Sequence, residues 1–243
     1  MPGSSSFDAR LRETTLLTPR VRELVFERVD AMPMAFEPGQ FVTTRLSSSA
    51  ATLKRSYSLA SAPDGTPRFA LAVTHVEGGP GSTWLHRIEP DTVVPFTGPF
   101  GAFTRRALDE HPSLFIATGT GVAPIRSMVR AALPSTCRQP LWVLLGVRNE
   151  ADILYRSEFE EASASNPRVR FDVTLSRPAS DWTGRRGYVQ AHARSLFDEL
   201  VSSASAEPHV YVCGLWKMVE SVRDLFRIEL GVPRGRVHSE RYD

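Results

Sequence analysis

The pattern of hydrophobic and polar residues changes near the middle of the chain. In residues 8–98, short segments alternate apolar and polar side chains between Gly, Pro and Ser, at residues 20–28, 40–46, 53–59, 68–74 and 92–96. Alternation with a period of two is typical of strands that bury one face. The first part of the chain is therefore expected to form an antiparallel β-barrel or sandwich.

After Pro112 the apolar segments no longer alternate. Continuous apolar runs at residues 114–118, 141–146, 169–175 and 209–213 are separated by helical patterns at residues 122–132, 153–164, 189–201 and 215–230. Such strands, alternating with helices, predict a parallel sheet with helices on both faces, and residues 236–240 would make it five-stranded. We therefore predict an antiparallel β-barrel domain over residues 1–106 and an α/β domain over residues 107–243.

Composition excludes several classes of protein. With 42% hydrophobic and 23% charged residues, the chain can form a folded core, which excludes disorder and coiled coils. Its two cysteines, Cys137 and Cys213, are too few for a disulfide scaffold, a four-cysteine zinc site or an iron–sulfur cluster. The six histidines show no metal-ligand spacing, so no bound metal is expected.

Net charge and targeting signals bear on the partners and the location of the protein. A net charge of +2 gives no argument for nucleic acid as a partner. Residues 1–10 lack a basic stretch followed by an apolar segment, and no apolar run is long enough to cross a membrane. We expect a cytoplasmic monomer that binds neither nucleic acid nor a membrane.

A turn suited to a phosphate group follows the first apolar strand of the second domain. Its candidate ligands are Gly119, Thr120, Gly121 and Pro124. Glycine lets the backbone approach a pyrophosphate, and the following helix N-terminus supplies free N–H groups. The alternative is an ordinary strand–helix turn. The third glycine of the usual dinucleotide fingerprint is absent, and Arg148 stands where a ribose-binding carboxylate is expected.

Basic and aromatic residues follow the third apolar strand. They are Ser176, Arg177, Arg185, Arg186 and Tyr188. A hydroxyl, guanidinium groups and a ring at the carboxyl edge of a parallel sheet are what a 2′-phosphoadenosine group needs. The alternative is a solvated basic loop.

Two segments of the first domain could hold a second ligand. Residues 55–58 offer a guanidinium, a ring and hydroxyls from Arg55, Ser56, Tyr57 and Ser58, with Arg55 and Tyr57 on one face of a strand. Residues 78–85 form a glycine-rich approach to a short helix and contribute Gly81, Ser82 and Thr83. Val73 and His75, just before it, complete these candidates. The alternative reading is a barrel-surface aromatic and an ordinary loop.

Six motifs in order resemble the ferredoxin–NADP reductase family, of the plant type. They are FEPGQF at 36–41, RSYS at 55–58, GPFGAF at 98–103, GTGVAP at 119–124, CGL at 213–215 and ERY at 240–242. The resemblance implies a barrel that binds FAD, followed by a five-stranded parallel domain that binds NADP(H) or NAD(H).

The resemblance also implies roles for individual residues on the flavin side. Arg55 would hold the flavin pyrophosphate together with the amides around Ser82 and Thr83. Tyr57 would stack on the flavin ring, and the Ser58 hydroxyl would lie near the flavin N5 atom.

On the nucleotide side, the resemblance places residues 119–124 against the pyrophosphate and Ser176, Arg177 and Tyr188 at the adenosine. Cys213, followed by Gly214, would lie beside the nicotinamide. Glu240 and Tyr242 match a glutamate and an aromatic residue near the flavin. The alternative for Cys213 is a small buried hydrophobic residue at a strand end.

By this resemblance the chain is an FAD-dependent oxidoreductase. NADPH would give a hydride to flavin N5, and single electrons would pass to a ferredoxin or flavodoxin. The alternatives are an NAD(P)H-dependent flavin or ferric-chelate reductase, the reductase component of an oxygenase, and a non-catalytic electron-transfer or regulatory subunit. Arg45 and Lys54 could attract an acidic carrier.

Overall fold

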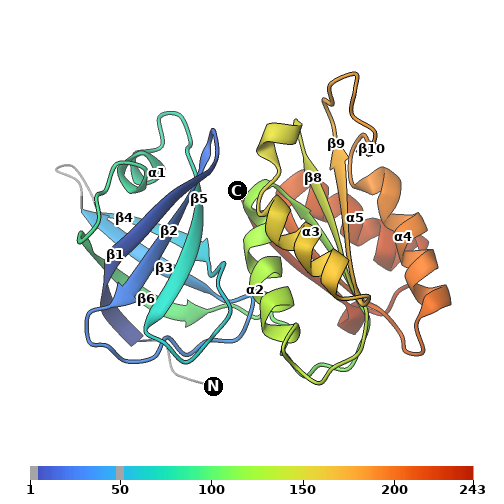
Figure 1. The fold of residues 1–243 in the computed structure, drawn as a ribbon, viewed down its shortest axis with the longest axis horizontal. Helices are drawn as coiled ribbons and strands as arrows, with labels where there is room; N and C mark the ends of the chain where they lie inside the picture. The colour runs from blue at the N-terminus through green and yellow to red at the C-terminus, as the bar shows by residue number, and fades with distance from the viewer. Residues whose placement is uncertain (1–4, 48–51, 243) are drawn as a thin grey trace. The chain divides into compact units, whose positions relative to one another are not determined.

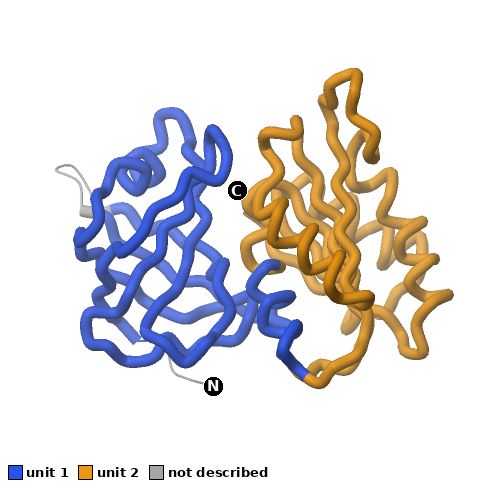
Figure 2. The backbone as a smooth tube through the Cα atoms, in the orientation of Figure 1, with its two compact units in different colours: residues 1–107, 126–135 blue, residues 108–125, 136–243 orange. Residues whose placement is uncertain are grey.

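The computed structural model describes residues 5–47 and 52–242, and the chain divides into two compact units (Figures 1 and 2). The barrel unit contains the chain up to Ala107 together with Arg126–Ser135, and the α/β unit contains the remainder. Helix α2 (Val122–Ala132) is therefore shared between the two. No helix among the described residues is long and apolar enough to cross a membrane.

The barrel unit is a curled antiparallel sheet. Its strands are β1 (Ser5–Thr18), β2 (Val21–Arg28), β3 (Phe41–Ser47), β4 (Thr52–Ser58), β5 (Arg68–Thr74) and β6 (Val93–Phe100), with the short helix α1 (Pro80–Leu85) after β5. Their order across the sheet is β4-β3-β6-β1-β2-β5. The two outer strands meet just beyond β4, where Leu59 pairs with Leu71 and the Ala60 amide donates to the Ala70 carbonyl at 2.8 Å. The predicted antiparallel barrel is confirmed.

Aromatic side chains on alternating strand positions fill the barrel. The rings of Phe26 and Phe96 lie 5.0 Å apart, and Phe69 lies 5.3 Å from Phe96. All three side chains are buried, whereas their neighbours along the strands, except Ala70, are partly or fully exposed. The alternation seen in the sequence arises because only one face of each strand contacts this core.

The α/β unit is a parallel sheet between helices, as predicted. Its strands are β7 (Ser113–Thr118), β8 (Leu141–Val147), β9 (Val169–Leu175), β10 (Arg185–Arg186), β11 (His209–Leu215) and β12 (Val237–Tyr242). Its other helices are α3 (Arg156–Ser165), α4 (Gln190–Ser203) and α5 (Trp216–Asp224). Helix α3 packs on β9 through stacked Phe159 and Phe171 rings, while α4 and α5 share one core with β7 and β11 (Figure 1).

The order of these strands, β10-β9-β8-β7-β11-β12, determines where a ligand can bind. The chain runs outward from β7 to β9 on one side and from β11 to β12 on the other. Such a reversal leaves a crevice at the carboxyl ends of the two central strands, here β7 and β11.

Two local features differ from the sequence-based expectation. The two-residue strand β10 adds a short sixth strand, because Arg185 and Arg186 pair with Thr174 and Leu175 of β9. The expected helix over residues 215–230 is α5 followed by a π-helical turn at Leu225–Glu229. Neither change alters the architecture.

Candidate cofactor-binding sites

The crevice between β7 and β11 is built from closely packed backbone. A Cβ atom at Gly121 would lie 2.3 Å from the Cys213 carbonyl oxygen, and one at Gly214 would lie 2.2 Å from Thr118 Oγ1. Gly119 and Gly214 have φ angles of +52° and +150°, which favour glycine. The predicted turn therefore packs directly against the end of β11, and glycine is required on both sides.

Thr118 belongs to this site although the sequence analysis did not single it out. Its Oγ1 atom accepts a weak hydrogen bond of 3.4 Å from the Leu215 amide, just beyond Cys213 and Gly214. The available signal was its position as the last residue of a strand before a glycine turn. Thr118 thus links the ends of β7 and β11 directly before the turn at Gly119–Gly121 and helix α2.

Cys213 is a buried neutral thiol. Strand register pairs it with Glu240, and Leu215 with Tyr242. Burial raises the pKa of Cys213, the Glu240 carboxylate raises it further, and a hydrogen bond to the Tyr242 side chain lowers it by less. The structure thus brings the predicted Cys213, Glu240 and Tyr242 together, and the thiol stays protonated near neutral pH.

Arg148 and Arg177 lie side by side at the ends of β8 and β9. The Arg177 amide donates to the Arg148 carbonyl at 2.8 Å, and the Ser176 amide donates to the Val147 carbonyl at 3.0 Å. Both arginines are exposed. Within residues 5–47 and 52–242, neither guanidinium has a hydrogen bond or ion pair. Two guanidinium groups beside a serine are groups that can bind a phosphate dianion.

The other two predicted arginines are engaged in the protein. Arg185 Nε lies 2.9 Å from Asp172 Oδ1, and Arg186 Nη2 donates to the Trp182 carbonyl at 2.6 Å. The Trp182 indole in turn donates to the Arg185 carbonyl at 2.9 Å. These contacts shape the loop before Tyr188, whose ring is 72% exposed and free to stack on a planar ligand.

In the barrel unit, β4 separates its side chains between two faces. Tyr57 packs against the barrel core, while Ser56 Oγ on the opposite face lies 3.0 Å from Thr43 Oγ1. Burial raises the pKa of Tyr57 to about 12, and the nearby Arg55 charge offsets this only in part. Ser58, at the end of the strand, is buried.

Arg55 borders the glycine-rich segment of α1. A Cβ atom at Gly81 would lie 3.1 Å from Arg55 Cγ, so the absence of a side chain lets the Arg55 stem pack closely against the backbone of α1. Ser82 Oγ accepts from the Val76 amide at 3.1 Å and holds the loop. A guanidinium beside a side-chain-free turn fits a diphosphate.

Three further candidates lie around the same loop. Thr83 Oγ1 is 3.5 Å from His75 Nε2, at the limit of a hydrogen bond. The Val73 side chain is fully buried, and its carbonyl is 2.8 Å from His86 Nε2. Only the backbone of Val73 can therefore contact a ligand. Burial lowers the pKa of His86, partly opposed by that carbonyl, which favours its neutral form.

Comparison with known proteins gives consistent matches. Residues 8–104 match the oxidoreductase FAD-binding domain family, and residues 115–224 match the oxidoreductase NAD-binding domain family. Ferredoxin–NADP reductase B of Sorangium cellulosum is 53% identical, with 98% of each chain covered. A glycine betaine monooxygenase reductase subunit of Pseudomonas aeruginosa is 28% identical over 91% of this chain, which spans 60% of that relative.

Solved structures agree on the fold. An Amycolatopsis cytochrome P450 reductase superposes with a TM-score of 0.84 at 26% identity, covering 98% of this chain and 70% of the other. Ferredoxin–NADP⁺ reductase from Plasmodium falciparum, solved with 2′P-AMP, superposes with a TM-score of 0.78 at 21% identity, covering 98% and 97%. The second likeness concerns the fold alone.

Proposed function

Because the chain belongs to the ferredoxin–NADP reductase family, we propose that it is an FAD-dependent oxidoreductase that oxidises NADPH and passes single electrons to a ferredoxin or flavodoxin. The observation that carries this proposal is the 53% identity with a ferredoxin–NADP reductase over nearly the whole of both chains. Bound FAD would accept a hydride and release electrons one at a time. Its natural electron partners are of the ferredoxin type.

In the barrel unit, Arg55 and the turn at Gly81–Thr83 would hold the flavin pyrophosphate. The fit rests on the close packing of the Arg55 stem against Gly81, which a side chain at that position would disturb. Tyr57 would supply an uncharged aromatic ring for stacking. Ser58 supplies a hydroxyl donor at the end of β4.

In the α/β unit, the backbone from Gly119 to Pro124 would receive the nucleotide pyrophosphate. The neutral Cys213 thiol is fully buried behind Gly214, where it brings no second negative charge beside Glu240. Tyr242, through its hydrogen bond, fixes the orientation of that thiol. These residues act by positioning the reacting ring and excluding water.

For the 2′-phosphate we propose Ser176, Arg177 and Arg148, with Tyr188 stacking on the adenine. The support is that Arg148 and Arg177 have no acidic partner among the described residues, whereas Arg185 is paired with Asp172. Arg185 and Arg186 would then act indirectly, by shaping the loop that carries Tyr188.

Steady-state kinetics test this assignment. We expect Arg177→Ala to raise the KM for NADPH about tenfold or more and leave that for NADH nearly unchanged, since a hydrogen bond to a charged group contributes about 1.5–3 kcal/mol. Arg138→Ala, an exposed arginine in a loop of the same unit, is the matched control. Equal effects on NADPH and NADH would contradict a role at the 2′-phosphate.

Reduction of an oxygenase component is the second candidate function, favoured by the similarity to monooxygenase reductase subunits.

Anaerobic addition of NADPH distinguishes a reductase from a non-catalytic subunit, because the yellow colour of the protein is bleached only if the protein is a reductase. The proposal also includes a monomeric state, which sedimentation tests, and a cytoplasmic location, which cell fractionation tests. It places the functional domain boundary near residues 106/107, which limited proteolysis tests.

A further inference from the structure

Tyr188 carries its exposed ring on a backbone that is held on both sides. Gly187, directly before it, has a φ angle of +98° and donates its amide to the Leu175 carbonyl at 2.8 Å. Val189, directly after it, is buried, and its carbonyl accepts the Ala193 amide at 3.0 Å in the first turn of α4. The ring is therefore free, but the backbone that carries it is fixed.

Thr174 of β9 holds the peptide group that precedes Tyr188. The Thr174 side chain is fully buried, and its Oγ1 atom donates to the Gly187 carbonyl at 2.9 Å. With the Gly187 amide bonded to Leu175, both backbone polar groups of Gly187 are bonded to β9. A buried hydroxyl needs an acceptor, and here the acceptor is the carbonyl that joins Gly187 to Tyr188. Thr174 thus sets the direction in which the chain enters Tyr188.

Asp172 lies two residues earlier, on the same face of β9. Its Oδ1 atom lies 2.9 Å from Arg185 Nε of β10, and its Oδ2 atom lies 2.7 Å from Arg170 Nε. Arg170 Nη1 in turn lies 2.6 Å from Glu199 Oε1 of α4. This chain of ion pairs joins β10 to α4, the two elements on either side of Tyr188.

These side-chain contacts matter because β10 is short. The strand has two residues at the edge of the sheet, and the loop before it projects beyond the carboxyl end of β9 (Figure 1). Two residues of backbone pairing hold an edge segment weakly. The contacts of Asp172 and Thr174 therefore supply much of what keeps residues 185–187 in place.

We propose that Asp172 and Thr174 are positioning residues for the adenine of the nucleotide, which act by holding residues 185–187 so that the Tyr188 ring meets adenine in one orientation. The inference rests on the proposed function and adds two residues of β9 to it. A ring that is ordered before binding gives higher affinity than one that must be ordered on binding. Because NADPH and NADH share adenine, the effect should be the same for both.

Steady-state kinetics of the FAD-loaded protein, with ferricyanide as the acceptor, test the proposal. Thr174→Val keeps the branched shape but removes the hydroxyl, and Asp172→Asn removes the charge. In each variant we expect the KM for NADPH and that for NADH to rise together, about fivefold, with kcat unchanged. Wild-type KM values for both nucleotides would overturn the proposal. So would a rise for NADPH alone, which would assign these residues to the 2′-phosphate.

Reduced nicotinamide mononucleotide, which lacks the adenosine half, distinguishes positioning from damage to the fold. Both variants should oxidise it at the wild-type rate. Losses as large as those with NADPH would overturn the proposal. Thr174→Ser keeps the hydroxyl and should retain the wild-type KM for NADPH, and a fivefold rise in this variant would also contradict the role of the hydroxyl.

A double-mutant cycle tests whether the effect passes through Tyr188. In the Tyr188→Ala background, adding Thr174→Val or Asp172→Asn should cause almost no further rise in KM, because the ring that they position is gone. A further fivefold rise in that background would overturn the proposal.

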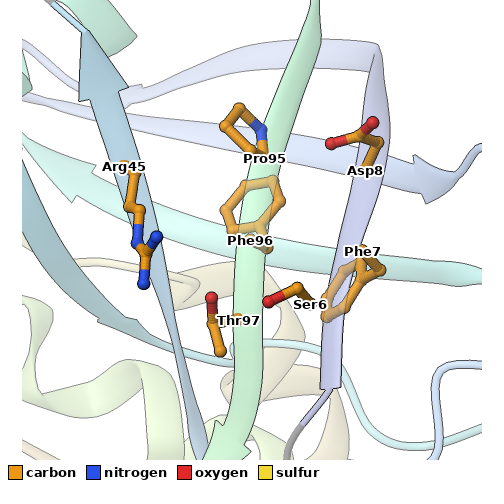
Figure 3. Close-up of a pocket in the computed structure, with 7 residues that line it drawn as sticks. All are labelled: Ser6, Phe7, Asp8, Arg45, Pro95, Phe96 and Thr97. Carbon is orange, nitrogen blue, oxygen red and sulfur yellow. The ribbon is translucent and has the colours of Figure 1, made fainter.

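Two variants of the barrel unit control for the substitutions themselves. Asp8→Asn and Thr97→Val make the same chemical changes at side chains that line an open depression of about 310 Å³ (Figure 3). Both should keep the wild-type KM for NADPH and NADH, and a fivefold rise in either control would overturn the proposal. Failure of the wild type to reduce ferricyanide with NADPH would instead refute the proposed function.

Discussion

Each unit has a glycine-rich turn assigned to a diphosphate, but the two turns have different surroundings. In the α/β unit, a Cβ at Gly121 would lie 2.3 Å from the Cys213 carbonyl oxygen and 2.6 Å from its carbon. In the barrel unit, the nearest atom to a Cβ at Gly81 is Arg55 Cγ at 3.1 Å, part of a flexible side chain. One glycine faces backbone, and the other faces a side chain that can move.

This difference distinguishes a glycine that the fold requires from a glycine that ligand binding requires. Backbone at the end of a central strand cannot yield without disturbing the sheet, so Gly121 is needed even in the absence of nucleotide. Arg55 can move aside for a methyl group, so Gly81 is needed mainly for what binds there.

Replacing Gly121 should have the largest effect. We expect Gly121→Ala to lower the free energy of unfolding by about 3 kcal/mol, because the new methyl group overlaps the Cys213 backbone. Urea denaturation of the FAD-saturated protein measures this. Gly235→Ala is the matched control, since a Cβ there meets nothing within 4 Å. Equal urea midpoints for Gly121→Ala and Gly235→Ala would mean that the fold does not require glycine at position 121, and the two turns would then not differ.

Replacing Gly81 should affect flavin binding more than stability. We expect Gly81→Ala to weaken FAD binding about tenfold, or about 1.4 kcal/mol, with little change in the unfolding midpoint. Fluorescence titration of the apoprotein measures the affinity. If the methyl group acts by displacing Arg55, adding Gly81→Ala to Arg55→Ala should cause almost no further loss. Additive losses would show that the two residues act independently.

The smallest effect concerns the opposite end of β11, where rings from separate strands form a cluster. His111 and His209 stack at 3.7 Å, and His209 Nδ1 lies 3.0 Å from His238 Nε2. Burial, followed by the charge on His111, lowers the pKa of His209 to about 4. Tyr211 also stacks on His238, while Asp109 and Arg236 are the charged groups nearby.

Acidification should therefore destabilise the α/β unit modestly. The unfolded chain binds protons at the ordinary histidine pKa of about 6.5, above the folded value, so stability is present above that pH and falls as the pH drops towards 4. We expect a loss of about 1 kcal/mol near pH 5, allowing for solvent screening. His209→Gln should flatten this pH dependence in urea denaturation, whereas the control His192→Gln, outside the cluster, should not.

The His209→Gln variant also tests which contacts hold the turn at Gly121. If Gly121 is held by contacts at the carboxyl end of β11, weakening the amino end in the His209→Gln variant should leave the affinity for NADH at neutral pH unchanged. A parallel loss of affinity and stability would mean that the turn depends on the whole strand.

The class of both units and the position of the glycine turn at residues 119–121 could be predicted from the sequence alone. Alternating positions in β2 and β5 predict one buried face, and unbroken apolar runs in β7, β8 and β11 predict a sheet covered on both sides. These features follow from local periodicity, which the chain carries irrespective of its distant contacts. The family resemblance, from six ordered motifs, supplied the candidate residue roles.

Only the tertiary structure decided which polar side chains are available. Nothing in the sequence distinguishes the four arginines at positions 148, 177, 185 and 186. In the structure, Arg185 forms an ion pair with Asp172, because β9 pairs with β10. The side chains of Arg148 and Arg177 have no ion pair within the described residues. The histidine cluster and the contact between Thr118 and Gly214 likewise join residues far apart in the chain. Such contacts depend on strand order and register, which local periodicity does not encode.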